Sequence, residues 1–206
     1  MKQNGSVKEK RVWSLAVFCG SRIGNSPEFD KEARTLGFLM AERNVRLVFG
    51  AGHVGLMGAL ADAVLEKGGE ALGVIPQALV NKELAHGGLT ELVITQTMHE
   101  RKAIMADQAD AFVALPGGFG TLDELFEILT WAQLGIHQKP VALLDGTGFY
   151  SGLLDWMQTL VNNGFVKLKC KEMLRVYQNP IDLLDGFGLQ IDQIRTAVQA
   201  RMPDIR

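Results

Sequence analysis

A glycine-rich stretch followed by a carboxylate is the part of this sequence whose residue types and spacing best suit chemistry. Glycines let a backbone approach a ligand closely and aim its N–H groups at one point. If a helix follows, its free N–H groups and positive dipole end meet at the same point. This pattern predicts a phosphate site that needs no lysine, with a purely structural turn as the alternative. The stretch consists of Pro116, Gly117, Gly118, Phe119, Gly120 and Thr121, and Glu124 follows it.

Glu124 lies one helical turn beyond Thr121, so the two residues share the helix face that begins at the glycines. The helix dipole also favours a carboxylate in a first turn, which is the alternative reason for an acid here. Asp123 and Glu127 can serve the dipole or the surface, whereas Glu124 has the spacing to face a ligand. We therefore predict that Glu124 is the carboxylate of the site.

Two adjacent cations, Arg101 and Lys102, follow another predicted strand. Cations at the start of a helix oppose its dipole unless an anion is present. The pair therefore indicates an anionic ligand, with a solvated helix end as the alternative.

A second glycine-rich turn, with Gly50, Gly52 and Gly55, fits the GxGxxG pattern between a strand and a helix. Alone, that pattern indicates a dinucleotide. The acid expected about 20 residues later is Glu70, which lies at the start of the next predicted strand rather than at its carboxyl end. Two other interpretations stay open: glycines that permit a tight turn, or a supporting phosphate or ribose contact.

Histidines and cysteines do not form a recognisable metal or redox motif. His53, His86, His99 and His137 lack the spacing of metal ligands, so no metal and no cofactor is predicted. The two cysteines show no CxxC spacing, and two reduced thiols are expected, with a disulfide as the alternative.

Short apolar runs that alternate with amphipathic segments must position these residues. Continuous apolar strands separated by helices predict an α/β fold, a single-domain Rossmann-like doubly wound parallel sheet with helices on both faces. We assign residues 13–206 to this domain and 1–12 to a flexible tail, and residues 77–88 to an irregular loop. The predicted strands are 13–19, 45–49, 71–75, 91–95, 111–115, 141–144 and 174–177, and the predicted helices are 27–43, 56–67, 99–108, 121–134, 150–161 and segments after Pro180 and Leu189.

Ligands of such a sheet bind beyond the carboxyl ends of its strands. The loops that meet there are 20–26, 50–58, 77–88, 95–102 and 116–124. We therefore assign Gly20, Ser21, Gly52 and Met98 to the same substrate site.

Composition excludes several partners. The 206 residues are 47% hydrophobic and 21% charged with a formal net charge of −2, so no whole-protein field attracts nucleic acid or an anionic membrane. Apolar runs stay shorter than the roughly 18 residues of a membrane span. The polar, basic start does not resemble a signal peptide, and a cytoplasmic location is expected.

The motifs together resemble the Lonely Guy family, phosphoribohydrolases that release the base from cytokinin riboside 5′-monophosphates and from AMP. Residues 116–124 match the family's PGGxGTxxE motif, and residues 98–102 and 130–137 continue the likeness. The resemblance covers roughly residues 14–187. Similar sequences often carry a lysine decarboxylase label, but no lysine here stands in a recognisable pyridoxal phosphate context.

The resemblance implies roles for individual residues. Residues 118–121 would bind the 5′-phosphate, and Arg101 and Glu124 would be the catalytic pair. Glu83, Lys102 and Thr130 would contact the substrate. The family is commonly dimeric, and the apolar face of residues 126–131 is a candidate interface, so a homodimer is expected.

Three function classes follow from these observations. The first is hydrolysis of the N-glycosidic bond of a purine nucleoside 5′-monophosphate. The alternatives are a non-catalytic carrier of a nucleotide or of molybdenum cofactor, and an NAD-dependent oxidoreductase. A passive carrier has no need of a carboxylate near the anomeric carbon, and the position of Glu70 disfavours NAD.

Overall fold

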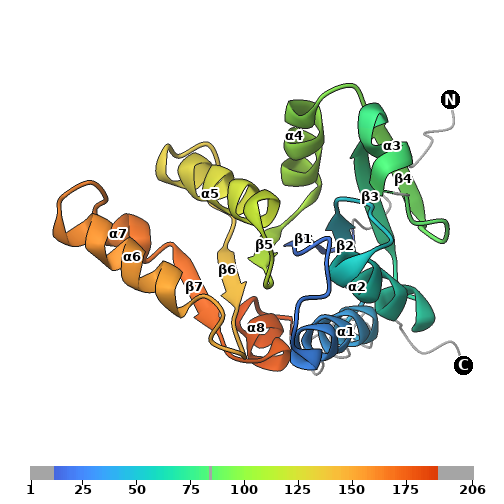
Figure 1. The fold of residues 1–206 in the computed structure, drawn as a ribbon, viewed down its shortest axis with the longest axis horizontal. Helices are drawn as coiled ribbons and strands as arrows, with labels where there is room; N and C mark the ends of the chain where they lie inside the picture. The colour runs from blue at the N-terminus through green and yellow to red at the C-terminus, as the bar shows by residue number, and fades with distance from the viewer. Residues whose placement is uncertain (1–11, 84, 190–206) are drawn as a thin grey trace, which may run out of the picture.

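The fold is built around one seven-stranded parallel sheet (Figure 1). The computed structural model describes residues 12–83 and 85–189, with the backbone alone for residues 81–83. The strand order is β4-β3-β2-β1-β5-β6-β7, and all neighbouring strands pair in parallel. This confirms the predicted α/β fold class.

The strands are β1 (Ser14–Phe18), β2 (Arg46–Phe49), β3 (Ala71–Pro76), β4 (Glu91–Thr95), β5 (Ala111–Ala114), β6 (Val141–Leu144) and β7 (Leu174–Tyr177). The helices are α1 (Pro27–Glu42), α2 (Gly55–Glu66), α3 (Gln77–Glu83), α4 (Met98–Gln108), α5 (Phe119–Gln133), α6 (Ser151–Asn162), α7 (Leu168–Lys171) and α8 (Pro180–Gly186).

The chain changes direction across the sheet once, beside β1. From β1 it adds β2, β3 and β4 outward on one side, and then returns to place β5 on the other side of β1. The connections that follow β1 and β5 therefore run in opposite directions along the sheet, which creates a topological switch point, where open α/β sheets bind ligands.

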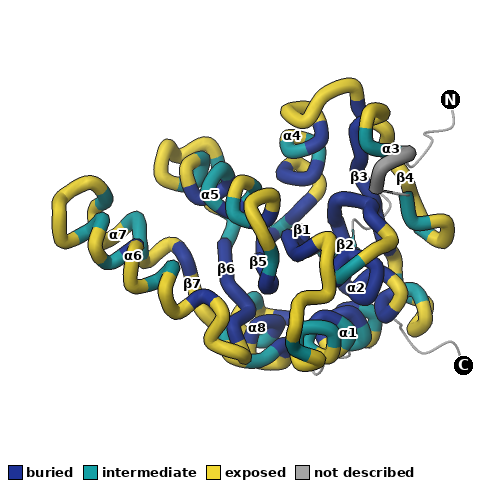
Figure 2. The backbone as a smooth tube through the Cα atoms, viewed as in Figure 1, coloured by how far each residue is buried: buried dark blue, intermediate teal, exposed yellow. Residues whose placement is uncertain are grey.

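Alternate residues of the central strands enter two separate cores. In β1, Leu15 and Val17 pack with α1, α2 and α8, whereas Ala16 and Phe18 pack with α4, α5 and α6. Figure 1 shows these two groups of helices on opposite faces of the sheet, and Figure 2 shows the central strands buried between them. Burial on both faces explains why the strands are continuous apolar runs.

The structure corrects two parts of the predicted element order. The segment 77–88, expected to be an irregular loop, begins with helix α3. The glycines that indicated a loop, Gly87 and Gly88, lie beyond this helix and do not interrupt it. The short helix α7 was not predicted. The predicted helix after Leu189 and most of the predicted tail lie outside the described residues.

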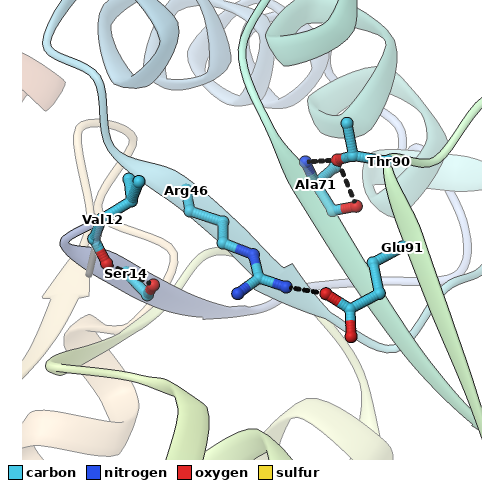
Figure 3. A network of polar contacts seen from close by, with 6 residues as sticks. All are labelled: Val12, Ser14, Arg46, Ala71, Thr90 and Glu91. Atoms are coloured by element: carbon cyan, nitrogen blue, oxygen red, sulfur yellow. Dashed lines mark hydrogen bonds and ion pairs between the residues drawn. The ribbon is translucent and has the colours of Figure 1, made fainter. Parts of the chain in front are cut away.

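Side chains connect the starts of several strands at the amino edge of the sheet (Figure 3). Arg46 at the start of β2 forms an ion pair with Glu91 at the start of β4. The Thr90 hydroxyl accepts from the Ala71 N–H and donates to the Ala71 carbonyl, 2.9 Å away. The Ser14 N–H donates to Asp110 Oδ2 over 2.8 Å. This edge is therefore closed by contacts within the chain.

Both cysteines are free thiols: Cys19 is buried at the end of β1, and Cys170 is half-buried in α7. Among the described helices, none combines the length and the apolar character needed to cross a bilayer.

Candidate active site

Three loops meet in close contact at the carboxyl edge, around the switch point. The Gly20 N–H after β1 donates to the Pro116 carbonyl after β5 over 3.0 Å, and the Gly20 carbonyl accepts from the Leu56 N–H of α2 over 3.0 Å. The Gly55 backbone has a φ of 65°, and a side chain there would collide with the Ser21 backbone. Glycines therefore bring these three loops together.

The three glycines of the loop between β5 and α5 have different surroundings. A methyl group at Gly117 would lie 2.0 Å from the Thr121 hydroxyl, so packing within the chain requires glycine there. A methyl group at Gly118 or Gly120 would meet no atom within 4 Å, and neither has a positive φ. Nothing in the described chain explains these two glycines, which border open space where a ligand can approach the backbone.

Helix α5 begins at this loop without a side-chain cap. Its N-cap is Gly118, and no side chain accepts a hydrogen bond from its first N–H groups. Side-chain caps are present on α1, α4 and α8, from Ser26, Thr97 and Asn179, whereas α2, α6 and α7 resemble α5 in having none. The uncapped N–H groups and the helix dipole provide a site for an anion. Phe119, the first residue of α5, is 94% exposed beside it.

Arg101 is buried, with 5% of its surface exposed. The alternative interpretation, a solvated cation at the start of a helix, therefore does not apply to it. Its Nε donates to the Val74 carbonyl over 3.1 Å and its Nη2 to the Gly50 carbonyl over 3.2 Å, while Nη1 lies 3.8 Å from Met98 Sδ. Within the described part of the chain it makes no ion pair. A buried cation held only by neutral groups is costly unless an anion joins it.

A capping box beside Arg101 offsets the unfavourable interaction between this cation and the dipole of α4. Thr97 and Glu100 form a capping box, in which the Thr97 hydroxyl accepts from the Glu100 N–H and the Glu100 carboxylate accepts from the Thr97 N–H. The Arg101 side chain itself extends from the helix start toward the sheet, where it reaches the carbonyls of Val74 and Gly50.

The turn that begins at Gly50 makes room for Arg101. A methyl group at Gly50 would lie 1.9 Å from Arg101 Nη2. This role could not be read from the GxGxxG pattern, because the two residues are 51 positions apart. Glu70 immediately precedes β3 at the amino edge of the sheet, on the far side from this turn. The position of Glu70 therefore argues against the dinucleotide interpretation of the pattern.

Lys102 joins α4 to α5. Its Nζ lies 2.8 Å from Asp123 Oδ2 and 3.1 Å from Glu127 Oε2. Burial alone would lower the pKa of the ammonium, but hydrogen bonds to the two carboxylates outweigh it and raise the pKa. Lys102 is therefore held as a structural link between the two helices rather than directed at the glycine loop.

Glu124 is half-buried on α5, between the glycine loop and α4. With Lys102, Phe18 and other side chains it lines a cavity of about 10 Å³, close to the volume that one water molecule requires. Burial raises the pKa of the Cys19 thiol, and the nearby Glu124 carboxylate raises it further, so the thiol stays protonated. Because it shares this cavity with Phe18, Glu124 lies beside the end of β1, at the switch point.

Other predicted residues are placed less directly. Gly52 is buried and pairs with Ala85 in a short bridge, while Ser21 and Met98 are exposed at the carboxyl edge. Thr130 lies six residues beyond Glu124, about 9 Å along α5 and on a different face. Its hydroxyl donates to the Phe126 carbonyl over 2.7 Å, so a single chain does not bring it to the loop. Glu83 ends α3, and its side chain lies outside the described set.

The histidines, cysteines and carboxylates of the described residues do not gather into any group of three that could hold a metal ion. The chemistry available here is that of a backbone anion site, a buried guanidinium and a carboxylate. These features define the class: a Rossmann-like α/β protein with a glycine loop and an acidic residue at its switch point.

Comparison with known proteins identifies the family within that class. A family profile described as "Possible lysine decarboxylase" matches residues 57–187. Cytokinin riboside 5′-monophosphate phosphoribohydrolase LOG2 of Arabidopsis thaliana is 44% identical over 176 residues, which cover 85% of this chain and 83% of the relative. LOG7 of the same plant is 43% identical and covers 90% and 87%. The chain therefore belongs to the Lonely Guy family.

Solved structures share the fold at low sequence identity. The molybdenum cofactor binding protein of Rippkaea orientalis has a TM-score of 0.66 and 21% identity, with 87% of this chain and 98% of that chain covered. The molybdenum cofactor carrier protein of Chlamydomonas has a TM-score of 0.64 and 19% identity, with 91% and 99% covered. At these identities the likeness shows the Rossmann-like fold alone.

Proposed function

We propose that the chain hydrolyses the N-glycosidic bond of purine nucleoside 5′-monophosphates and releases the free base and ribose 5-phosphate. One observation carries the proposal. Gly118 and Gly120 border open space at the uncapped start of α5, and Glu124 follows one turn later. The names of relatives that are more than 40% identical over most of the chain support the same reaction.

The loop would bind the 5′-phosphate through backbone N–H groups of residues 118–121 and the Thr121 hydroxyl. This binding lies away from the bond that breaks, so its role is to fix the ribose in position. A substrate that lacks the phosphate loses that orientation. Nucleoside monophosphates should therefore react far better than free nucleosides.

Glu124 would act at the anomeric carbon. Cleavage of a ribosyl–base bond passes through an oxocarbenium-like state that is positive at this carbon. A carboxylate stabilises that charge and accepts a proton from the attacking water. Asp123 and Glu127 both pair with Lys102 of α4, and Glu124 lines the small cavity beside Phe18 at the end of β1.

Arg101 would meet negative charge, either on the departing base or on the phosphate and ribose. Val74 and Gly50 already accept from two of its nitrogens, so the guanidinium is held in place before a ligand arrives. A preorganised cation in a buried site stabilises developing charge without reorganisation. Lys102 would contribute indirectly, because it fixes α4 against α5.

The base pocket would be mostly apolar, with Met98, which is 40% exposed, and the half-buried Leu79 near the end of β3. An apolar pocket admits adenine and N6-alkylated adenines, and an isoprenoid tail adds apolar burial. Isopentenyladenosine monophosphate should therefore match or exceed AMP in kcat/KM.

A homodimer is part of the proposal. Two residues of the predicted interface face, Ile128 and Leu129, are buried within the chain. Fewer apolar residues of this face are therefore available to a second copy than the sequence indicates. Helix α6 buries only Met157, and Trp156 remains half-exposed against Phe126. This apolar surface suits a second copy. Light scattering at micromolar concentration should give twice the chain mass, and a monomer mass would reject the dimer.

Both free cysteines suit the reducing environment of the cytoplasm, the location that we propose for the protein.

Incubation with AMP tests the main proposal. Free adenine and ribose 5-phosphate should appear together, while adenosine should remain nearly unchanged over the same time. Binding of AMP without turnover would instead favour a carrier. Rapid hydrolysis of adenosine would reject the phosphate anchor.

A further inference from the structure

Tyr150 is a buried residue that the proposed mechanism does not use, yet it contacts the base of the glycine loop. It precedes α6 and is 1% exposed. Its hydroxyl donates to the carbonyl of Leu115 over 2.6 Å. Leu115 immediately precedes Pro116, where the chain leaves β5 and enters the loop.

The ladder between β1 and β5 is irregular at this carbonyl. The register pairs Phe18 with Ala114, and the Leu115 N–H donates to the Phe18 carbonyl. A regular parallel ladder would continue with the Gly20 N–H donating to the Leu115 carbonyl. The Gly20 N–H instead donates to the Pro116 carbonyl, one residue farther along. The Leu115 carbonyl is left out of the ladder, and Tyr150 supplies its donor.

Tyr150 is itself fixed by the neighbouring turn. Its N–H donates to the buried carboxylate of Asp145 over 3.1 Å, and the Asp145 N–H donates to the Tyr177 carbonyl over 2.9 Å. The Tyr150 ring packs edge-on against Phe149, with centroids 4.9 Å apart. Burial raises the pKa of Tyr150, with smaller contributions from Cys19 and Asp145, so the hydroxyl stays a donor.

We propose that Tyr150 is a positioning residue for the phosphate-binding loop. Its hydroxyl holds the Leu115 carbonyl out of the β1–β5 ladder, which leaves the Gly20 N–H to the Pro116 carbonyl and sets the position of Gly117. The inference rests on the proposed phosphate role of this loop. Without the hydroxyl, the two carbonyls compete for one N–H group, and the loop shifts toward the regular register.

The test compares the two tyrosines of the sequence. Tyr150→Phe removes the hydroxyl and keeps the ring, and Tyr177→Phe makes the same change on β7, where the ring contacts Phe187. Affinity for inorganic phosphate is measured by calorimetry and as inhibition of AMP hydrolysis. Affinity for adenine is measured in parallel, and thermal unfolding reports the fold.

For Tyr150→Phe we expect phosphate affinity to fall by roughly three- to tenfold, the effect of one hydrogen bond, and KM for AMP to rise by the same factor. Adenine affinity should not change, and Tyr177→Phe should match the wild type throughout. Replacement of Tyr150 by 4-aminophenylalanine, which keeps the ring and a donor, should restore phosphate affinity.

Phosphate affinity of Tyr150→Phe within twofold of the wild type would overturn the inference. Equal losses for phosphate and adenine would do the same, because they would indicate a general structural role. A 4-aminophenylalanine variant that binds phosphate as weakly as Tyr150→Phe would also overturn it. If the wild type neither binds phosphate nor hydrolyses AMP, the proposed function itself fails, and this inference falls with it.

Discussion

At the amino edge of the sheet, charged side chains find partners within the chain, as the ion pair between Arg46 and Glu91 illustrates (Figure 3). At the carboxyl edge, Arg101 is more deeply buried than Arg46, and its polar partners among the described residues are two backbone carbonyls and a thioether. The two arginines, at opposite edges of one sheet, thus differ in their partners: Arg46 pairs with a carboxylate, and Arg101 donates to backbone carbonyls. The difference is consistent with an amino edge that serves stability and supports the proposal that the carboxyl edge binds an anionic ligand.

Replacement of Glu124 by Gln should have the largest effect. The change removes a charge that only the transition state requires, so AMP hydrolysis should fall by about 10³-fold or more, while AMP binding and the fold are retained. Initial rates and calorimetric titration with AMP measure the two parts. Glu91→Gln at the amino edge is the matched control and should keep wild-type turnover. Turnover by Glu124→Gln near the wild-type rate would show that another group is the catalytic carboxylate.

Replacement of each arginine by Met tests the comparison directly. Arg101→Met should lower kcat/KM for AMP by about 10²-fold, because a preorganised cation is lost. Its unfolding temperature should stay level or rise, since the buried cation that is removed has no carboxylate partner among the described side chains. Arg46→Met should keep its activity and lose at most about 1 kcal/mol of stability, as is usual for a partly exposed ion pair. Arg101→Met with full activity would contradict the assignment of the two edges.

A smaller effect is expected from Gly50→Ala, because the added methyl group displaces the guanidinium of Arg101 rather than removing it. Misplacement by about 1 Å can cost 10–100-fold in rate, and we expect a loss of about tenfold. Gly87→Ala is the matched control, since a methyl group there meets no atom within 4 Å. Steady-state kinetics on both variants measures the effect. Equal activities would show that Arg101 tolerates the shift.

The smallest expected effect is a pH dependence of stability near the amino edge. His137 lies between α5 and β6, where Nε2 contacts the Ile128 carbonyl over 3.0 Å and Nδ1 accepts from the Lys139 N–H over 3.1 Å. Burial, assisted by the Lys139 charge, lowers the pKa of His137 below its ordinary value near 6.5. The unfolded chain then binds the extra proton, so the free energy of unfolding should fall as the pH drops below about 6.5.

Urea unfolding between pH 5 and pH 8 measures this dependence. His137→Gln should lose less stability than the wild type toward pH 5. Parallel curves for the two proteins would assign the pH dependence to other groups.

The strands and the position of the glycine loop could be predicted from the sequence, because both depend on local patterns. Continuous apolar runs such as β1 and β5 require burial on both faces, and the glycines before α5 are adjacent in the chain. The fold class and the positions of β1 to β7 along the chain followed from these patterns. Helix α3 was not predicted, because the glycines after it indicated a loop for the whole segment. Its seven residues contain no glycine or proline.

The contacts that position the site could not be predicted, because they join residues that are distant in the sequence. The room that Gly50 leaves for Arg101 depends on the pairing of β2 with β3. The partners of Lys102 lie on another helix, and so its charge alone indicated a ligand. In the same way, the hydroxyl of Tyr150 reaches a carbonyl 35 residues away. Local charge patterns identified the helix starts but not the long-range partners of the side chains there.

The switch point makes the sheet two halves that meet along one ladder, between β1 and β5. Arg101 is attached to the half that contains β2 and β3, whereas the glycine loop and Glu124 follow β5 in the other half. A nucleotide held by both would act as a clamp across this seam. Bound substrate should therefore slow hydrogen exchange along the β1–β5 ladder more than at the outer strands. Occupancy of the site would in this way stabilise the contact between the two halves of the sheet.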